Sequence, residues 1–557
     1  MNNNSKGASH LRNTEENQQR NTSGVELEAD FVVVGSGAAG LTAAITARRR
    51  GLSVIVLECQ DVVGGTTARS GTWIWSPNNR WMRELGFTDE RDDAIRYMAR
   101  LSFPERYQAD AERFGLDPHE FEMLNVFYST SGKALEELAD AGALDPVVKA
   151  NAPDYFADLP EDKAPYGRVV VSRGRARPDQ LTGAEWVLDL RDTTLGLGVD
   201  IRFNHRVSDV IQKDGRITGV VGTANGEAFT VNSKRGVLFA TGGFTHNPDL
   251  MSDHMSTPVR LGGAAKGSRG DFMRIGASLG ARLHNTAAAW LAPIPLEALV
   301  RDPQSVTTNI FALRGDSMIM VNKYGRRTVN EKLPYHELGR SMLRWDASQA
   351  EHPDLRMFMI FDSSARVHFS DGTSGNPIKP PGEHDPNLVE GNTLEELSAA
   401  IKKRILEIGP THMAGLEIAQ DFASNLKETI EEFNRHAATG KDPIFHRGES
   451  AIELFRNGPA RPGNENNAAL FPFDSTGPYF ALILAPGTLD TKGGPAIDAE
   501  GRVLRASDGE PIPGLFAAGN CAGFPSGQAY WAGGATIGLA VTFGYLAALN
   551  VSAIKQN

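Results

Sequence analysis

Three unbroken apolar runs, each leading into a glycine turn, stand out in the pattern of hydrophobic and polar positions. They cover residues 31–34, 236–240 and 514–518, and the turns that follow contain Gly35, Gly242 and Gly519. Strands of parallel sheets are buried on both faces, so their sequences are apolar without polar alternation. The pattern therefore predicts three sheet strands that bring glycine turns to a common ligand.

The first turn has the spacing of a dinucleotide-binding motif. Gly35 permits a tight turn, Gly37 lets the backbone approach a pyrophosphate, and Gly40 lets the following helix pack closely. A second apolar strand then ends at Glu58, where a carboxylate can accept hydrogen bonds from a ribose hydroxyl. We therefore expect a dinucleotide site here; a glycine turn that serves packing alone is the alternative.

The residues expected to contact the cofactor come from six segments of the chain. Glycines and hydroxyls in loops can lie against phosphates without side-chain clash, and a helix N-terminus adds free N–H groups. The expected residues are Gly35, Gly37, Ala38, Ala39, Gly40, Glu58, Gly65, Thr66, Thr67, Ser70, Gly71, Ala240, Thr241, Gly242, Gly519, Asn520, Ala535 and Ile537.

The remaining pattern divides the chain. Residues 80 to about 145 are mostly helical in pattern, and short strands follow between about 186 and 240, with a hairpin turn at Asp214-Gly215. Residues from about 290 to 465 have Pro-rich loops at 376–386 and helical stretches at 393–408 and 425–437. The predicted units are a disordered tail (1–28), a cofactor-binding domain in two parts (29–290 and 468–557) and an inserted domain (291–467).

Composition narrows the class of protein. The 557 residues carry a net charge of −11 with no basic stripe, which argues against a nucleic-acid partner. Two distant cysteines indicate neither a disulfide framework nor a metal site, and favour a cytoplasmic setting. The uncharged stretch 531–554 is long enough to span a bilayer, but its glycines fit a buried helix better. We expect no transmembrane span, and peripheral membrane association stays open.

The three glycine turns together resemble the FAD-dependent fumarate reductase and succinate dehydrogenase flavoprotein superfamily. Within it, further stretches are similar to the 3-ketosteroid Δ1-dehydrogenases. These stretches are Ser70-Gly71 with 74–79, 325–331 with Pro334-Tyr335, 447–450, Pro486-Gly487 with 491–494, and 530–538. The resemblance spans nearly the whole chain after residue 28. It implies an α/β fold, in which a Rossmann-like FAD-binding domain carries an inserted α+β substrate-binding domain.

Enzymes of that family remove two hydrogens from adjacent ring carbons next to a ketone and pass them to FAD. By resemblance, Tyr530 and the Gly534 N–H bind the carbonyl, and Tyr335 takes the α-proton. Because a phenol has a pKa of about 10, such a base needs a neighbouring donor or positive charge. The family uses a second tyrosine as a helper, for which we expect Tyr155, with Tyr166 as the alternative. No His lies between Gly64 and Gly71, so FAD is expected to be non-covalent.

Two departures from the family pattern bear on the substrate. This chain has Tyr530-Trp-Ala-Gly-Gly534 where the family commonly has Tyr-Pro-Gly-Pro-Gly, and Trp73 adds bulk beside Trp75. Indoles that line the pocket would shrink it, which favours a monocyclic ketone over a four-ring steroid. Indoles that pack away from the site would leave the choice open, together with the electron acceptor, the oxygen reactivity and the oligomeric state.

Three competing hypotheses remain. A fumarate or succinate enzyme of the same superfamily would need Arg and His near the flavin, for which Arg326, Arg327 and His336 are the candidates. A flavoprotein without turnover would have no need of both Tyr335 and Tyr530. An NAD-dependent dehydrogenase would not need the additional glycine turns at 240–243 and 514–520.

Overall fold

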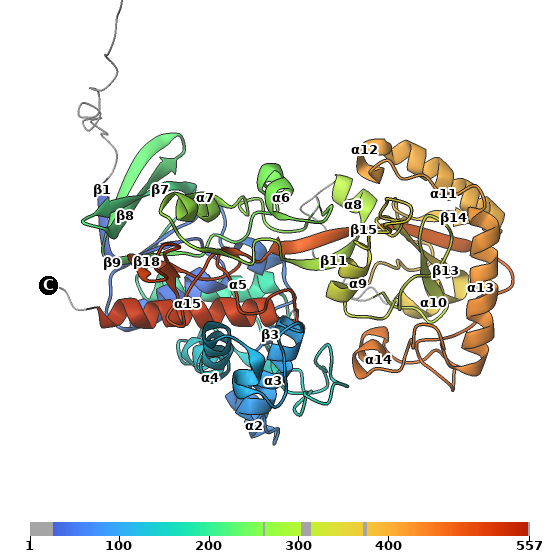
Figure 1. Ribbon diagram of the computed structural model, residues 1–557, viewed down its shortest axis with the longest axis horizontal. Coiled ribbons are helices and arrows are strands. Elements are labelled where there is room, and N and C mark those ends of the chain that lie inside the picture. Colours follow the sequence, from blue (N-terminus) through green and yellow to red (C-terminus); the bar gives the residue numbers. More distant parts are fainter. Residues whose placement is uncertain (1–25, 180, 260–261, 302–312, 371–375, 555–557) are drawn as a thin grey trace, which may run out of the picture.

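The computed structural model describes residues 26–179, 181–259, 262–301, 313–370 and 376–554. Within them the chain forms two bodies, each built around one sheet, that lie side by side along the long axis of the molecule (Figure 1). The predicted tail over 1–28 lies outside the described residues up to residue 25. Strand β1 begins at Glu26, slightly before the predicted start of the first domain.

The first sheet holds the three predicted apolar strands next to one another. Its strand order is β17-β18-β9-β1-β2-β6, and β1 pairs in parallel with β2 and β9, as does β18 with β9. All three glycine turns therefore lie at the same edge of the sheet. The strands of this sheet are β1 (Glu26–Val34), β2 (Val54–Leu57), β6 (Asp200–Arg202), β7 (His205–Lys213), β8 (Arg216–Ala224), β9 (Glu227–Phe239), β17 (Arg502–Leu504) and β18 (Pro511–Ala517).

The predicted hairpin in this sheet is confirmed. Strands β7 and β8 pair antiparallel, and Asp214 (φ 50°) and Gly215 (φ 77°) form the left-handed turn between them. The expected onset of strands near residue 186 was wrong, because α5 (Gly183–Gly196) occupies that segment and buries Trp186 and Leu190. Its apolar residues are spaced for one helix face, a period that the strand interpretation overlooked.

Two helices cover the glycine turns from one side of the sheet. Helix α1 (Ala38–Arg49) follows β1 directly, and α15 (Ala535–Ala553) packs across α1, α4 and β3. Among the described helices, α15 alone is long and apolar enough to cross a bilayer, and 72% of its most apolar stretch is buried in protein. Its composition is that of a core helix enclosed on all sides.

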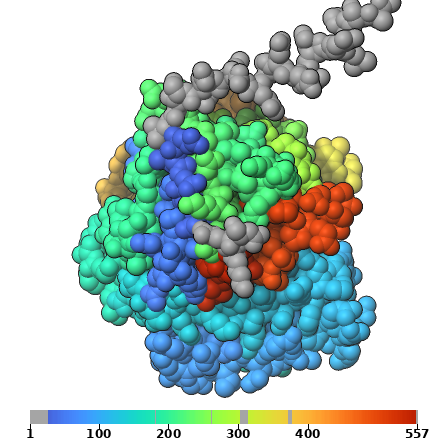
Figure 2. Space-filling view, turned by 90° about the vertical axis from the view of Figure 1, so that its left-hand side faces the viewer, coloured from blue at the N-terminus to red at the C-terminus, as the bar shows by residue number. Residues whose placement is uncertain are grey.

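A helical layer lies beneath the first sheet, as predicted for residues 80–145. It comprises α2 (Arg80–Glu84), α3 (Arg91–Ser102), η2 (Glu112–Gly115) and α4 (Pro118–Asp140), with a small sheet of β3 (Ile74–Trp75), β4 (Pro146–Val148) and β5 (Val169–Ser172). Figure 2 shows this blue layer at one side of the molecule, with β1 and the green hairpin strands above it. The layer buries one side of the loop that carries Tyr155.

The second sheet forms the core of the other body. Its order is β11-β15-β13-β12, with β14 beside β15, and all of its pairs are antiparallel. The predicted helical stretches are confirmed as α11 (Leu394–Ile408) and α13 (Phe422–Thr439). The strands are β11 (Ala289–Pro295), β12 (Met318–Val321), β13 (Met357–Asp362), β14 (Val389–Gly391) and β15 (Tyr479–Thr491).

Strand β15 connects the two bodies, and Figure 1 shows it running from the second sheet toward the first. Residues after 467 were predicted to belong to the cofactor domain, whereas β15 is central to the second sheet. The domain boundaries themselves stay a prediction. The remaining elements are η1 (Gly65–Arg69), α6 (Pro248–His254), α7 (Asp271–Ser278), β10 (Leu283–His284), α8 (Leu296–Arg301), α9 (Tyr335–Ser341), α10 (Ser363–Phe369), α12 (Pro410–Met413), α14 (Ala451–Asn457) and β16 (Gly494–Pro495).

Candidate active site

A cavity of about 760 Å³ runs along the glycine turns and reaches the second body. Of the residues predicted to hold the cofactor, all but Gly40 and Ala535 line it. Gly40 is instead buried against the turn, and the Ala535 N–H is bonded to the Ala532 carbonyl 3.2 Å away. Tyr155, Tyr335, Tyr530 and Gly534 line the same cavity. The site therefore combines the first sheet's turns with side chains from both bodies.

The geometry of the first turn matches the three glycine roles. Gly35 has φ +104°, and a Cβ there would lie 2.3 Å from the Ala240 oxygen, so only glycine fits. A Cβ on Gly40 would lie 2.0 Å from the Gly35 oxygen. Around Gly37, by contrast, the closest contact of a Cβ would be Thr67 Oγ1 at 3.5 Å. The turn is thus closed on its protein side and open on its cavity side, where a pyrophosphate can approach.

Glu58 joins the glycine turn to the second strand. The Ser36 N–H and hydroxyl both donate to Glu58 Oε2, and the Gln60 N–H donates to Oε1 at 2.9 Å. The side chain is buried and lines the cavity. A carboxylate has about four acceptor positions, so Glu58 can hold the turn and still accept a ribose hydroxyl. Ser36 was not predicted, because a serine between two glycines looks like a spacer.

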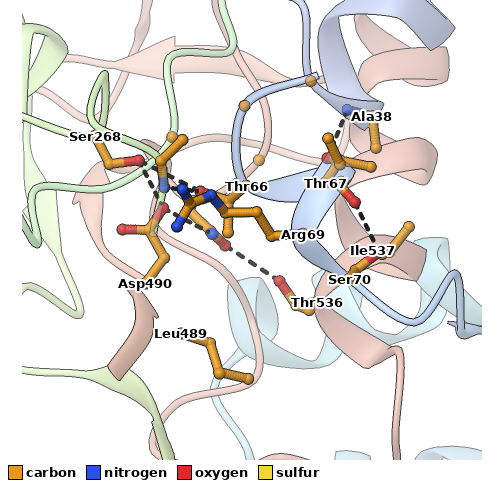
Figure 3. Close-up of a pocket in the computed structure, with 18 of the residues that line it drawn as sticks. Ala38, Thr66, Thr67, Arg69, Ser70, Ser268, Leu489, Asp490, Thr536 and Ile537 are labelled. Atoms are coloured by element: carbon orange, nitrogen blue, oxygen red, sulfur yellow. Dashed lines mark hydrogen bonds between the residues drawn. The ribbon is translucent and has the colours of Figure 1, made fainter. Parts of the chain in front are cut away.

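Hydroxyls and one carboxylate surround the middle of the cavity, where Thr66, Ser268 and Asp490 converge from separate segments (Figure 3). Thr67 Oγ1 accepts a hydrogen bond of 3.0 Å from the Ala38 N–H at the start of α1. Asp490 accepts bonds from Ser268 (3.2 Å) and Asn520 (3.3 Å), and burial raises its pKa. Asp490 was missed in the sequence analysis, where it is an unremarkable residue near the end of a strand.

Three tyrosines meet at the end of the cavity that faces the second body. Tyr155, Tyr335 and Tyr530 are each almost fully buried, and their ring centroids lie 5.5–5.7 Å apart with edge-to-face geometry. Tyr335 and Tyr155 are hydrogen-bonded to each other. Burial is the largest cause of the raised pKa of both residues. The predicted helper is therefore Tyr155; Tyr166 does not line the cavity.

The Tyr530 hydroxyl and the Gly534 N–H lie next to each other at the start of α15. Burial raises the pKa of Tyr530, and a hydrogen bond with the Gly534 N–H acts in the opposite direction. Gly534 is the N-cap of α15 and has φ +94°, and a Cβ there would lie 2.4 Å from the Trp73 backbone. A helix N-terminus carries a partial positive charge, so a developing enolate oxygen would be stabilised at this position.

A buried ion network fixes the loop that carries Tyr155. Arg168 pairs with Asp154 at 2.6 Å, with Asp162 at 2.8 Å and with Asp89 at 2.7 Å, all fully buried. The Trp75 indole also donates to Asp154 at 2.7 Å. Breaking a buried network of this kind by removing one partner costs about 3–5 kcal/mol. The position of Tyr155 is therefore fixed by the bonds of its neighbour Asp154 as well as by its own side-chain contacts.

Arg456 was not predicted and lies against the tyrosines. Its guanidinium donates to the Tyr155 hydroxyl at 2.9 Å and lies 4.9 Å and 5.0 Å from the ring centroids of Tyr155 and Tyr335. It follows Phe455 on α14 (Ala451–Asn457) and lines the cavity. In the sequence, Arg456 lies in the short run Phe-Arg-Asn-Gly shortly after the 447–450 stretch. This run has no recognisable motif spacing, so it did not indicate a site.

The indoles divide between pocket and core. Trp73 lines the cavity and lies beside Phe455 at 6.3 Å between centroids. Trp75 and Trp531 are fully buried against each other and Phe127, away from the cavity lining. The Trp531 indole donates to the Ser102 hydroxyl at 2.9 Å. Of the three indoles Trp73, Trp75 and Trp531, Trp73 is the one that narrows the cavity. Trp290, which was not predicted, also narrows it and packs on Tyr530 with 4.6 Å between the ring centroids.

The residues proposed for a dicarboxylate enzyme are engaged elsewhere. Arg326 bonds Asn425 and Glu428 at the surface, and Arg327 is enclosed with Glu331 and Asp442. His336 accepts a bond from the Leu291 N–H on Nδ1 while Nε2 bonds the Gln528 carbonyl, and burial lowers its pKa well below the usual value. Because this imidazole is neutral and already bonded on both nitrogens, it cannot serve as a proton donor to a substrate.

Comparisons with known proteins agree with this geometry. The model of the FAD binding domain family matches residues 30–537. The chain is 31% identical to 4-oxocyclohexanecarboxylate 2-dehydrogenase of Sinomonas cyclohexanicum, over 94% of this chain and 92% of that protein. It is also 31% identical to 3-oxosteroid 1-dehydrogenase of Mycolicibacterium smegmatis, over 94% and 97% of the two chains.

Among solved structures, the chain is similar to the 3-ketosteroid Δ1-dehydrogenase of Sterolibacterium denitrificans in complex with 1,4-androstadiene-3,17-dione. The TM-score is 0.80 at 25% identity, over 95% of this chain and all of that one. A probable fumarate reductase of Shewanella frigidimarina is more distant, at 23% identity. The fold and site define an FAD-dependent oxidoreductase acting on CH–CH groups. The chain belongs to the FAD-binding family and, within it, to the 3-ketosteroid dehydrogenase-like flavoproteins.

The residues present fit FAD. The open face of Gly37 and the N-terminus of α1 suit the pyrophosphate, and Glu58 suits the ribose. Thr66, Thr67 and Asn520 supply polar contacts along the rest of the cavity. Attachment of FAD without a covalent bond stays a prediction.

Proposed function

We propose that this protein oxidises a ring ketone to the α,β-unsaturated ketone, with Tyr530 and the Gly534 N–H binding the carbonyl and Tyr335 taking the α-proton. FAD, when bound, accepts the hydride from the β-carbon. The observation that carries the proposal is the convergence of three tyrosine rings and the α15 N-terminus on one end of the cavity. This convergence supports a proton acceptor and an oxyanion site that would act on one substrate ring.

The carbonyl site accounts for the acidity of the α-proton. Two preorganised donors stabilise the enolate oxygen as it forms, and removal of one such donor typically costs about 2.7–4 kcal/mol of barrier. Burial makes these hydrogen bonds stronger than they would be in water. The same burial excludes solvent, so the α-proton passes to a protein group and not to bulk water.

We infer further that the substrate is a monocyclic ketone, of the kind named for the Sinomonas relative. Trp73 narrows the cavity beside Gly533, where a Cβ would already lie 2.7 Å from the indole. Trp290 covers Tyr530 from another side. We also propose that the protein is cytoplasmic. The electrons would pass from the reduced flavin to an acceptor that is not identified.

Product analysis tests this function directly. The flavin-loaded protein, with an artificial electron acceptor, would be given 4-oxocyclohexanecarboxylate, cyclohexanone, a 3-ketosteroid and succinate in separate reactions. We expect enones two hydrogens lighter than the ketones, with higher kcat/KM for the monocyclic substrates. Conversion of the steroid alone would overturn the inferred ring size. Conversion of succinate alone would overturn the ketone assignment.

A further inference from the structure

Tyr335 and Tyr155 can act as a base only if a neighbouring group stabilises the phenolate form. Tyr335 is the assigned proton acceptor, yet burial raises its pKa well above the usual value. The neutral phenol is a poor base, so a charge close to the pair has to favour the phenolate. This question rests on the proposed function and concerns the same site.

Arg456 is the cation placed to do this. It donates to the Tyr155 hydroxyl at 2.9 Å, and its guanidinium lies about equally far from the two rings, 4.9 Å and 5.0 Å from their centroids. The same Tyr155 hydroxyl is hydrogen-bonded to Tyr335. A hydrogen bond from a cation stabilises a phenol oxygen as the phenolate, so Arg456 opposes the burial that raises the pKa of Tyr155.

We propose that Arg456 is the positioning residue that makes this tyrosine pair a base, by holding the negative charge on Tyr155. As the α-proton leaves the ring carbon for the Tyr335 oxygen, Tyr335 passes its own proton to the Tyr155 phenolate. The C–H electron pair becomes the enolate held by Tyr530 and Gly534. The β-hydride goes to FAD, so protons and electrons balance with one two-electron reduction of the cofactor.

The other charges around the pair are accounted for. Asp154 precedes Tyr155 and raises its pKa, but Arg168 and the Trp75 indole bond that carboxylate on the side away from the cavity. Tyr530 raises the pKa of Tyr335, and the His336 ring lies 5.8 Å from Tyr530 as a neutral imidazole. Arg456 is the positive charge that acts on both Tyr155 and Tyr335.

Arg456→Met and Arg456→Lys test the proposal, with Arg435→Met on the exposed side of α13 as the matched control. Tyrosine ionisation would first be followed by ultraviolet difference spectroscopy in the flavin-loaded protein without ketone. We expect the tyrosine transition that is lost in Tyr155→Phe to move upward by about one pH unit or more in Arg456→Met, because the cation that opposes the raised pKa of Tyr155 is gone. Arg456→Lys should keep the tyrosine transition close to its pH in the unmodified protein. Arg435→Met should leave the pH of the transition unchanged.

Kinetics with cyclohexanone give the second readout. In Arg456→Met, kcat should fall about tenfold at neutral pH and recover as the pH is raised, with KM nearly unchanged. Flavin absorbance and thermal melting would confirm that the variant is folded. An unchanged tyrosine titration and pH profile would overturn the proposal. A rise in KM alone, confined to ketones that carry a carboxylate, would overturn it in favour of a substrate-binding arginine.

The two proposals fail separately. If no ring ketone reduces the flavin of the unmodified protein, the proposed function is wrong. The coupling of Arg456 to Tyr155 is still decided in that case, because the titration needs no substrate.

Discussion

Tyr335 and Tyr155 are hydrogen-bonded to each other, and the two rings meet edge to face with centroids 5.7 Å apart. The two residues come from different bodies of the molecule, Tyr335 from the start of α9 and Tyr155 from a loop above the helical layer. The proposed proton-accepting pair is thus assembled only when both bodies are in place.

Tyr335→Phe should nearly abolish turnover while leaving the flavin bound. General base catalysis typically contributes about 10²–10⁴-fold, so kcat should fall by that factor with little change in KM. Anaerobic single-turnover reduction of the flavin measures it. Tyr324→Phe is the matched control, because the Tyr324 hydroxyl bonds Glu351 outside the cavity. Full turnover by Tyr335→Phe would remove this residue from the scheme.

Tyr530→Phe should weaken the carbonyl site without removing the base. Loss of one of two donors should lower kcat by about 10²–10³-fold, since the Gly534 N–H remains. The pH profile should keep its shape and shift toward lower pH, because Arg456 and Tyr155 are untouched while a neighbour that raises the pKa of Tyr335 is lost. Rates over a range of pH check both statements, and a change of slope with no loss of rate would contradict them.

Gly35→Ala should prevent FAD binding, whereas Gly51→Ala should not. Both glycines have positive φ, at +104° and +87°, so both substitutions strain the backbone by about 1–2 kcal/mol. A Cβ at Gly35 would also lie 2.3 Å from the Ala240 oxygen, and at Gly51 it would meet nothing within 4 Å. Flavin content after purification distinguishes them. Equal flavin loss in both variants would show that strain, not crowding at the turn, decides binding.

Trp73→Ala should enlarge the substrate end of the cavity. The ratio of kcat/KM for a 3-ketosteroid to that for cyclohexanone should rise, because the smaller side chain removes a wall of the cavity. Trp75→Phe is the comparison, since that indole is buried outside the cavity lining and supports Asp154. An unchanged ratio in Trp73→Ala would mean that the indole does not determine the size of the substrate ring system that the cavity accepts.

Cys59 should react very slowly with thiol reagents in the folded protein. Burial, followed by the Glu58 charge, raises the pKa of Cys59 to about 12 from an ordinary value of 9.0, so little thiolate forms at neutral pH. The folded state binds this proton more tightly than the unfolded chain. Its contribution to stability is therefore present below pH 9 and lost as the pH rises toward 12.

Thiol titration at several pH values measures this reactivity, with unfolded protein as the reference. Cys521, whose pKa is raised to about 11 by burial, should be equally slow. Glu58→Gln should speed modification of Cys59 and leave Cys521 unchanged. Rapid modification of the native protein at neutral pH would contradict the raised pKa of both thiols.

The glycine turns were predictable because their constraints are local. The spacing of Gly35, Gly37 and Gly40 and the apolar strand before them set the backbone, and the structure places the turn next to Ala240 as expected. The hairpin at Asp214-Gly215 was predictable for the same reason, since two left-handed residues in a row require such a pair.

The rest of the site depends on side chains brought together over long separations. Arg456 and Tyr155 are 301 positions apart, and nothing near either residue indicates the other. The sequence left open whether the indoles line the pocket, because spacing along a loop does not determine which way an indole points. Helix α5 was overlooked because its apolar face was read together with the strands that follow.

Anaerobic mixing of the flavin-loaded protein with a cyclic ketone, monitored by the visible absorption band of oxidised flavin, tests the central claim most directly. We predict that cyclohexanone or its 4-carboxylate bleaches the band in the unmodified protein, that Tyr335→Phe does so far more slowly, and that succinate leaves the band unchanged. Bleaching by succinate, with none by any ring ketone, would contradict the account.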